Sequence, residues 1–301
     1  MNRLIHTLAL IALLLVAPLA RAELKVLACE PEWGALVKEL AGDKVSVYVA
    51  TTALQDPHRI EARPSLVAAA RNAGLVVCTG AELEVGWLPL LIRQSGNSAI
   101  QPGKPGHFEA AAYVRMLDVP QRLDRADGDV HAAGNPHIQT DPRNIALVAE
   151  PLARRLAELD PANAATYQAR SADFQARWKA AIQRWEQSAA PLRGVPVVVQ
   201  HKAFPYLQQW LGLVEVAALE PKPGVEPTSA HLSTVLAGLK TRPAKMILRA
   251  AYNDPRGADW LAERTQLPVV VLPFTVGGNE QAKDLFSLFD DTVQRLLKAS
   301  R

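Results

Sequence analysis

Short apolar segments alternate with amphipathic segments in two separate parts of this chain. In the first half, apolar runs at residues 24–28, 45–50 and 75–78 alternate with helix-like stretches. The same alternation restarts near residue 195 and continues to about residue 297. Apolar strands that alternate with helices form parallel sheets covered on both faces. The sequence therefore predicts two α/β units.

A long helix is predicted between the two units. Asp160-Pro161 opens a segment that continues to about Ala189 without an internal Gly or Pro. At 1.5 Å per residue, about 30 residues would span roughly 45 Å, which is long enough to bridge two domains. We expect four parts: a signal peptide (1–22), an N-terminal α/β lobe (23–160), a linking helix (161–192) and a C-terminal α/β lobe (193–301).

The N-terminus has the pattern of a secretory signal peptide. Arg3 precedes an apolar stretch at residues 8–19, and Ala20-Arg21-Ala22 fits the small-x-small cleavage rule. The apolar stretch is shorter than the ~20 residues of a membrane span, and no later segment approaches that length. We therefore expect an exported protein without a membrane span. No basic run with interleaved aromatic residues indicates nucleic-acid binding.

The two cysteines, Cys29 and Cys78, each end an apolar run. If these runs are adjacent parallel strands, their ends lie side by side and within reach of a disulfide. Disulfides persist in exported proteins. The alternative is a pair of buried thiols, and the sequence leaves both open.

Three histidines follow turns or strand-like runs. His58 and His137 each follow a proline, and His201 follows the apolar run at residues 195–200. A neutral imidazole at a strand end is a ready transition-metal ligand, and three of them would make a Zn²⁺ site with one position open. The three are far apart in the sequence, so only the fold could assemble them. The alternative is that none of them binds a metal. His58 would then be a turn residue, His137 a loop residue and His201 a packed residue at a strand end.

Several motifs accompany these histidines. They are Asp56-Pro57-His58, Arg63-Pro64-Ser65, Gly80-Ala81-Glu82-Leu83-Glu84 with Trp87, Asn135-Pro136-His137, Thr140-Asp141-Pro142, His201-Lys202-Ala203-Phe204 with Tyr206, and Glu226-Pro227. Together they resemble the periplasmic metal-binding proteins of zinc and manganese ABC importers, over essentially the whole mature chain. The resemblance implies two α/β lobes joined by one long rigid helix, with a metal cleft between the lobes. It also implies capture of a metal ion and delivery to an ABC-transporter membrane permease, without enzymatic activity. We expect a periplasmic monomer.

The resemblance also implies the metal ligands. His58 and His137 match the two imidazole ligands of the N-terminal lobe, and His201 matches the first ligand of the C-terminal lobe. Manganese-type members usually carry a carboxylate at the position of His201. Imidazole suits Zn²⁺ better than Mn²⁺, which favours oxygen donors. We therefore expect Zn²⁺ as the transported cargo.

The chain departs from the family pattern at the fourth ligand. The family commonly has an Asp just after the final strand, whereas here the run 269–272 continues into Pro273-Phe274-Thr275. The fourth ligand could be water, Glu280, His131 or Asp129. We favour water, because three histidines with an open position suit zinc.

Two other functions fit parts of the pattern. The missing Asp could mark a binding protein or metallochaperone of a metal-chelate or siderophore system. A three-histidine zinc site with a bound water also resembles a hydrolytic centre, for which Glu280 is the visible general base. No nucleophile motif accompanies Glu280, so a zinc hydrolase is the weaker alternative.

Overall fold

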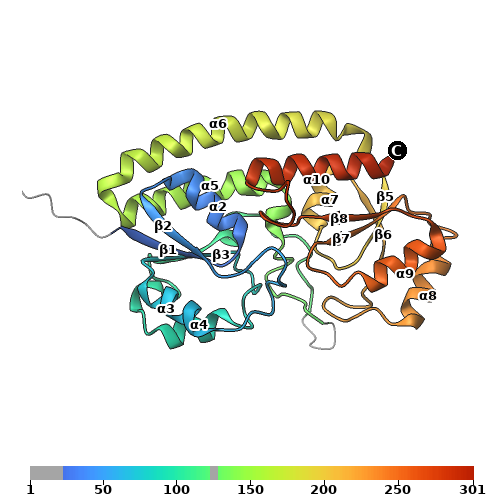
Figure 1. The fold of residues 1–301 in the computed structure, drawn as a ribbon, viewed down its shortest axis with the longest axis horizontal. Coiled ribbons are helices and arrows are strands. Elements are labelled where there is room, and N and C mark those ends of the chain that lie inside the picture. The colour runs from blue at the N-terminus through green and yellow to red at the C-terminus, as the bar shows by residue number, and fades with distance from the viewer. Residues whose placement is uncertain (1–22, 123–127) are drawn as a thin grey trace, which may run out of the picture.

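The computed structural model describes residues 23–122 and 128–301, so the predicted signal peptide lies outside the described residues. Two lobes lie side by side, and the long helix α6 (Ala164–Ser188) runs across both of them (Figure 1). Each lobe contains a four-stranded sheet, with strand orders β2-β1-β3-β4 and β6-β5-β7-β8. The predicted fold class, two parallel-sheet lobes joined by one long helix, is confirmed.

The elements of both lobes alternate as the apolar pattern indicates. The N-terminal lobe contains β1 (Leu24–Ala28), α2 (Pro31–Ala41), β2 (Val45–Val49), α3 (Pro64–Asn72), β3 (Leu75–Cys78), α4 (Leu88–Ser95), β4 (His107–Glu109) and α5 (Pro142–Leu159). The C-terminal lobe contains β5 (Pro196–Val199), α7 (Pro205–Leu211), β6 (Val214–Ala218), α8 (Ser229–Gly238), β7 (Met246–Ala250), α9 (Arg256–Thr265), β8 (Val269–Leu272) and α10 (Leu285–Ser300). All strand pairs are parallel.

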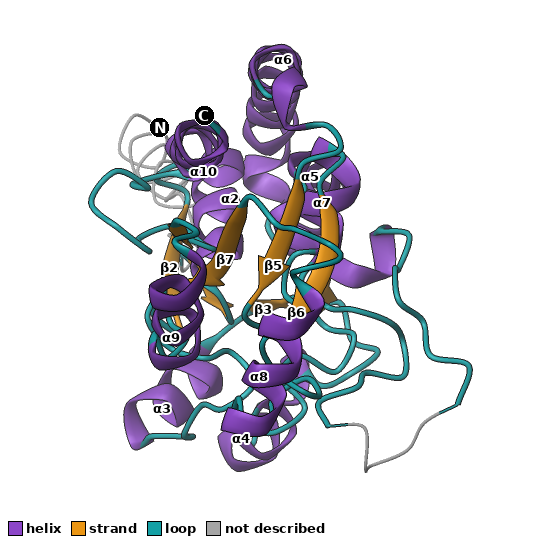
Figure 2. Cartoon of the chain, turned by 90° about the vertical axis from the view of Figure 1, so that its right-hand side faces the viewer, coloured by secondary structure: helices purple, strands orange, loops and turns teal. Residues whose placement is uncertain are grey.

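Each sheet is buried on both faces. Val197 and Val199 of β5 join the large central core, whereas Val198 between them packs with residues of α8 and α9. Figure 2 shows α8 and α9 on one side of this sheet and α10 with α6 on the other. Because successive side chains of a strand point to opposite faces, continuous apolar strands such as these need cover on both sides.

Helix α6 is anchored by two tryptophans on one face. The rings of Trp178 and Trp185 lie 5.6 Å and 5.2 Å from that of Phe289 in α10. The Trp178 indole donates to the carbonyl of Pro142, and the Trp185 indole donates to Asp290. These contacts fasten α6 to α5 and α10, so the connection between the lobes is packed along its length.

Two helices begin later than the sequence indicates. The long helix starts with a short 3₁₀ turn, so α6 has 25 residues and spans about 37 Å. The sequence at residues 83–94 also predicts a helix, but α4 begins only at Leu88. Ala81 and Glu82 have positive φ, and the Glu84 carboxylate accepts backbone N–H groups from the end of β3. These bonds hold a turn where a helix was expected.

Cys29 and Cys78 form a disulfide, with their Cα atoms 4.8 Å apart. Strands β1 and β3 are paired through Ala28 and Val77, which places the two cysteines side by side. The disulfide alternative therefore holds. In the part of the chain that the structure describes, no helix is long and apolar enough to span a membrane.

Reduction of this disulfide is expected to lower the free energy of unfolding by up to about 4 kcal/mol, because the bond closes a loop with a sequence separation of 49. Urea unfolding with and without reductant measures the change. The Cys29→Ala/Cys78→Ala variant is the control, since reductant should not affect it. A wild-type protein equally stable in reductant would contradict this expectation.

Candidate metal centre

His58, His137 and His201 come together between the lobes. One ligand nitrogen from each ring lies within 4.8 Å of those of the other two. The ring centroids are 5.4 Å apart for His58 and His137, 5.9 Å for His58 and His201, and 5.4 Å for His137 and His201. His58 lies in the loop after β2, His137 precedes a 3₁₀ turn at Ile138–Thr140, and His201 lies beyond the carboxyl end of β5. The structure therefore groups the three predicted ligands.

Two short motifs fix the orientation of the N-terminal-lobe imidazoles. Nδ1 of His58 lies 2.7 Å from Oδ1 of Asp56, and Nδ1 of His137 lies 2.8 Å from Oδ1 of Asn135. Each oxygen also accepts the backbone N–H of the same histidine, at 3.0 Å and 3.1 Å. The proline between the two residues restricts the turn. An Nδ1 that donates leaves Nε2 with its lone pair free for a metal.

His201 is oriented by a residue from a different strand end. Its Nδ1 lies 2.6 Å from Oε2 of Glu220, which follows β6. The same oxygen accepts the backbone N–H of Gly224 at 2.8 Å. The sequence pattern did not single out Asp56, Asn135 and Glu220 as orienting residues. The repeated x-Pro-His pattern could have indicated the first two, whereas only the fold reveals Glu220.

The surroundings of His137 favour neutral imidazole. Burial, together with the neighbouring imidazoles, lowers the pKa of His137 well below its usual value. Its side chain is 1% exposed, and Nε2 of both His58 and His137 is buried without a hydrogen-bond partner. Burial raises the pKa of Asp56, but the hydrogen bond from His58 lowers it. The net effect is a pKa below the usual value, so Asp56 stays charged. Nε2 of His137 is therefore ready to bind a metal without first losing a proton.

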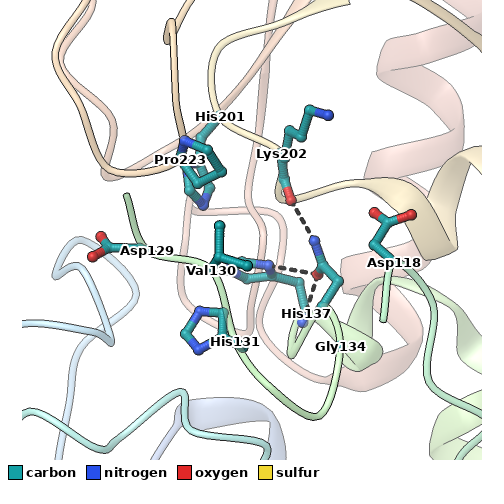
Figure 3. Close-up of a pocket in the computed structure, with 10 residues that line it drawn as sticks. Asp118, Asp129, Val130, His131, Gly134, His137, His201, Lys202 and Pro223 are labelled. Atoms are coloured by element: carbon teal, nitrogen blue, oxygen red, sulfur yellow. Dashed lines mark hydrogen bonds between the residues drawn. The ribbon is translucent and has the colours of Figure 1, made fainter. Parts of the chain in front are cut away.

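His131 lies beside this group. Its ring stacks on that of His58 with centroids 5.3 Å apart, and its Nε2 is buried without a partner. Burial lowers the pKa of His131 to about 4. His131, His137 and His201 line a cavity of ≈ 420 Å³, in which Figure 3 shows the rings at different heights along one wall. His131 can therefore reach the surroundings of a metal held by the other three.

The other candidates for a fourth ligand are placed less favourably. The Asp129 carboxylate lies 3.6 Å from Arg59 and points away from the labelled histidines in Figure 3. Glu280 is exposed and does not line the cavity. Thr275, in the segment after β8, donates its hydroxyl to Glu32.

The segment that carries His131 links the two lobes. The backbone N–H of Asp129 donates to the carbonyl of Pro223 at 2.8 Å. The side-chain amide of Asn135 donates to the carbonyl of Lys202 at 2.7 Å, marked by the dashed line at Lys202 in Figure 3. The hydroxyl of Tyr206 donates to the carbonyl of Asn135 at 2.7 Å. These bonds form one side of the cavity and join the lobes around it.

The chain has two parallel-sheet lobes, a packed linking helix and three imidazoles that converge between the lobes. These features are those of a substrate-binding protein for a divalent metal ion. The chain belongs to the family described as the zinc-uptake complex component A, periplasmic, whose model matches residues 26–299. The predicted family is thus confirmed. Its members are substrate-binding proteins of metal ABC transporters, which work with a membrane permease and an ATPase, and are not enzymes. The hydrolase alternative is therefore set aside.

The chain is similar to both zinc- and manganese-named proteins. It is 26% identical over 275 residues to the high-affinity zinc uptake system protein ZnuA of Paracoccus denitrificans, covering 79% of each chain. It is 22% identical over 269 residues to the manganese ABC transporter substrate-binding lipoprotein PsaA of Streptococcus anginosus, covering 87% of this chain and 83% of the relative. A crystal structure of ZnuA shares the fold, with a TM-score of 0.76, 22% identity and coverage of 92% and 99%. The choice of metal therefore depends on this chain's own ligands.

Proposed function

We propose that this protein captures Zn²⁺ in the periplasm and delivers it to the membrane permease of an ABC importer. His58, His137 and His201 are the proposed ligands. The observation that carries the proposal is the convergence of their nitrogens within 4.8 Å, with every Nδ1 already held by an oxygen acceptor. A set of imidazoles favours zinc over manganese, which prefers oxygen donors.

We propose water as the fourth ligand. The ≈ 420 Å³ cavity beside His137 and His201 admits several water molecules, since each takes up about 30 Å³ in the liquid. His131 stands next to the same space and is the protein residue that could replace the water. Asp129 and Glu280 are weaker alternatives, because Asp129 lies beside Arg59 and Glu280 does not line the cavity.

The same cavity favours one alternative cargo, a metal chelate. Its volume exceeds that of a single ion, so a small chelator could fill the open coordination position. This would make the protein a binding protein or metallochaperone of a metal-chelate or siderophore system.

We also propose the domain organisation and location that the sequence indicates. Residues 1–22 are a cleaved signal peptide, and residues 161–192 join an N-terminal lobe (23–160) to a C-terminal lobe (193–301). The protein is a monomer in the periplasm.

Parallel titrations of metal-stripped protein with Zn²⁺ and Mn²⁺, monitored by competition with a chromophoric chelator, test the proposed cargo. We expect one tight zinc equivalent and manganese binding that is at least about 100-fold weaker, because all three proposed protein ligands are imidazoles. Equal affinities, or tighter manganese binding, would contradict zinc selectivity. Absence of tight binding for either free ion would favour the chelate cargo.

The orienting residues provide a second test. Asp56→Ala is expected to weaken zinc binding by about 10–100-fold, the usual cost of losing an outer-shell partner. Asp56→Asn should retain most of the affinity, because Asn135 performs the same role for His137. Asp254→Ala is the matched control, since Asp254 also accepts a backbone N–H two residues later but does not line the cavity. Equal affinities for Asp56→Ala and the control would contradict the role of Asp56.

A further inference from the structure

A second group of polar side chains is buried where the two lobes meet. Three carboxylates belong to it: Glu30 after β1, Glu32 in the first turn of α2, and Glu84 in the turn before α4. Their exposed fractions are 3%, 1% and 2%. The Cys29–Cys78 disulfide brings the ends of β1 and β3 together and so places this group at the carboxyl end of the sheet. Buried carboxylates are rare unless something compensates their charge.

When all three carboxylates are ionised, their hydrogen bonds leave one oxygen over. Protonation of Glu30 or Glu84 allows a hydrogen bond between these two side chains. Glu84 is held by the backbone N–H groups of Thr79, at 2.7 Å, and Gly80, at 3.1 Å. Oε2 of Glu30 accepts the hydroxyl of Thr79 at 3.3 Å. Oε1 of Glu30 is buried and has no hydrogen-bond partner.

Gln139 supplies a second unpartnered oxygen from a separate segment. It lies in the 3₁₀ turn Ile138–Thr140, is 2% exposed, and its Oε1 is also buried without a partner. Glu30, Glu32 and Gln139 line the same cavity. Two orphaned acceptors on one cavity call for an occupant that donates hydrogen bonds or carries positive charge.

The cavity itself restricts what that occupant can be. Its volume open to a water-sized occupant is ≈ 10 Å³, about enough for one water molecule or one ion. No Lys, Arg or His is among its lining residues, so no cationic side chain there compensates the carboxylates. The available donors are carboxylate, amide and hydroxyl oxygens, which suit a hard cation rather than zinc.

We propose that this cavity is a second cation site, which binds one Ca²⁺-sized hard cation through Glu30 Oε1 and Gln139 Oε1, with Glu32 supplying further negative charge. Ca²⁺ accepts irregular coordination by about 6–8 oxygens, and the rest would have to come from other lining residues such as Thr51, Gln55 and Thr275. Mg²⁺ keeps several waters, for which a cavity of ≈ 10 Å³ has no room. The site is separate from the histidines and does not depend on zinc binding by them.

The occupant would connect the lobes. Glu30 and Glu32 belong to the N-terminal lobe, and Glu32 already accepts the hydroxyl of Thr275, which follows β8 of the C-terminal lobe. Phe274 and Thr275 also line the cavity. A cation here therefore stabilises the packing of α2 against the segment after β8, beneath the turn that carries His137.

Protonation is the competing state. Burial raises the pKa of both Glu32 and Glu84 to about 7, and that of Glu30 well above its usual value. A cavity occupied only by protonated carboxyls, with or without a water molecule, needs no metal. Direct cation binding separates the two states.

Terbium luminescence tests the site, because Tb³⁺ is a hard cation of similar size to Ca²⁺ and is sensitised by nearby tryptophan. The indole of Trp33 donates to Thr79 at 2.8 Å, and Thr79 donates to Glu30, so Trp33 lies two hydrogen bonds from the site. The His58→Ala/His201→Ala background removes the histidine centre. We expect one equivalent of sensitised Tb³⁺, displaced by Ca²⁺ but not by equal Mg²⁺, and at least tenfold weaker binding in Glu30→Gln.

The control is Glu61→Gln, a change at an exposed carboxylate, which should leave terbium binding unchanged. Ca²⁺ should also raise the melting temperature of the background protein and of the control, but not that of Glu30→Gln. If Glu30→Gln fails to fold, Gln139→Leu provides the same comparison. Absence of sensitised emission, or equal Tb³⁺ binding in Glu30→Gln and the control, would overturn the proposal and leave the carboxyls protonated.

Discussion

His137→Ala is expected to lower the affinity for Zn²⁺ by well over about 100-fold, because losing a direct ligand costs more than losing an outer-shell partner. His137 is the most buried of the three histidines, at 1% exposed, and its Nε2 has no partner among the described residues. Its Nδ1 is fixed by Asn135, so no alternative rotation of the ring satisfies that nitrogen without breaking this bond. Nε2 is therefore available to bind an external group.

The same change should have a small effect on the metal-free fold. Truncation leaves a cavity, which destabilises the protein. It also removes a buried nitrogen without a partner, which costs about 1–3 kcal/mol when left in place. We therefore expect the two effects to offset each other largely in the melting temperature.

A competition titration gives the affinity, and circular dichroism gives the melting temperature. His231→Ala is the control, because the His231 ring is bonded to the carbonyl of Ala218 in the C-terminal lobe. A zinc affinity for His137→Ala within about threefold of the control would contradict the proposed ligand set.

Replacing His201 by a carboxylate is expected to shift the metal preference toward manganese. The single change His201→Glu would place a new carboxylate beside Glu220, which now lies 2.6 Å from Nδ1 of His201. Two adjacent carboxylates repel each other and tend to share a proton. The informative variant is therefore His201→Glu/Glu220→Gln, in which the amide can still donate to the new ligand.

We expect this double variant to lower the ratio of zinc affinity to manganese affinity by at least about tenfold, since Mn²⁺ favours oxygen donors. Parallel titrations of the double variant and of Glu220→Gln alone measure the ratio and separate the two changes. An unchanged ratio in the double variant would show that residue 201 does not determine metal selectivity.

The sequence predicts the fold well because its apolar strands are continuous and short. The run at residues 195–200 is typical of a strand buried on both faces of a covered parallel sheet, and β5 is found in that position. The local motifs Asp56-Pro57-His58 and Asn135-Pro136-His137 also carry their own orienting oxygens, so the turn geometry follows from neighbouring residues. Such features depend on local chemistry and can be predicted.

Features formed by distant segments could not be predicted in this way. Glu220 meets His201 because β5 and β6 are neighbours in the sheet, and nothing near either residue indicates the contact. The turn at Ala81 and Glu82 likewise depends on Glu84 bonding to the end of β3, which a helical pattern conceals. Glu30 and Gln139 line one cavity only after the lobes pack together.

Anomalous diffraction from zinc-loaded crystals, with data collected on both sides of the zinc absorption edge, tests the central claim most directly. We predict one zinc peak between the lobes, about 2.0–2.1 Å from Nε2 of His58, His137 and His201, with a non-protein ligand in the fourth position. A zinc peak elsewhere, or one that lacks any of these three histidines, would contradict the proposed centre.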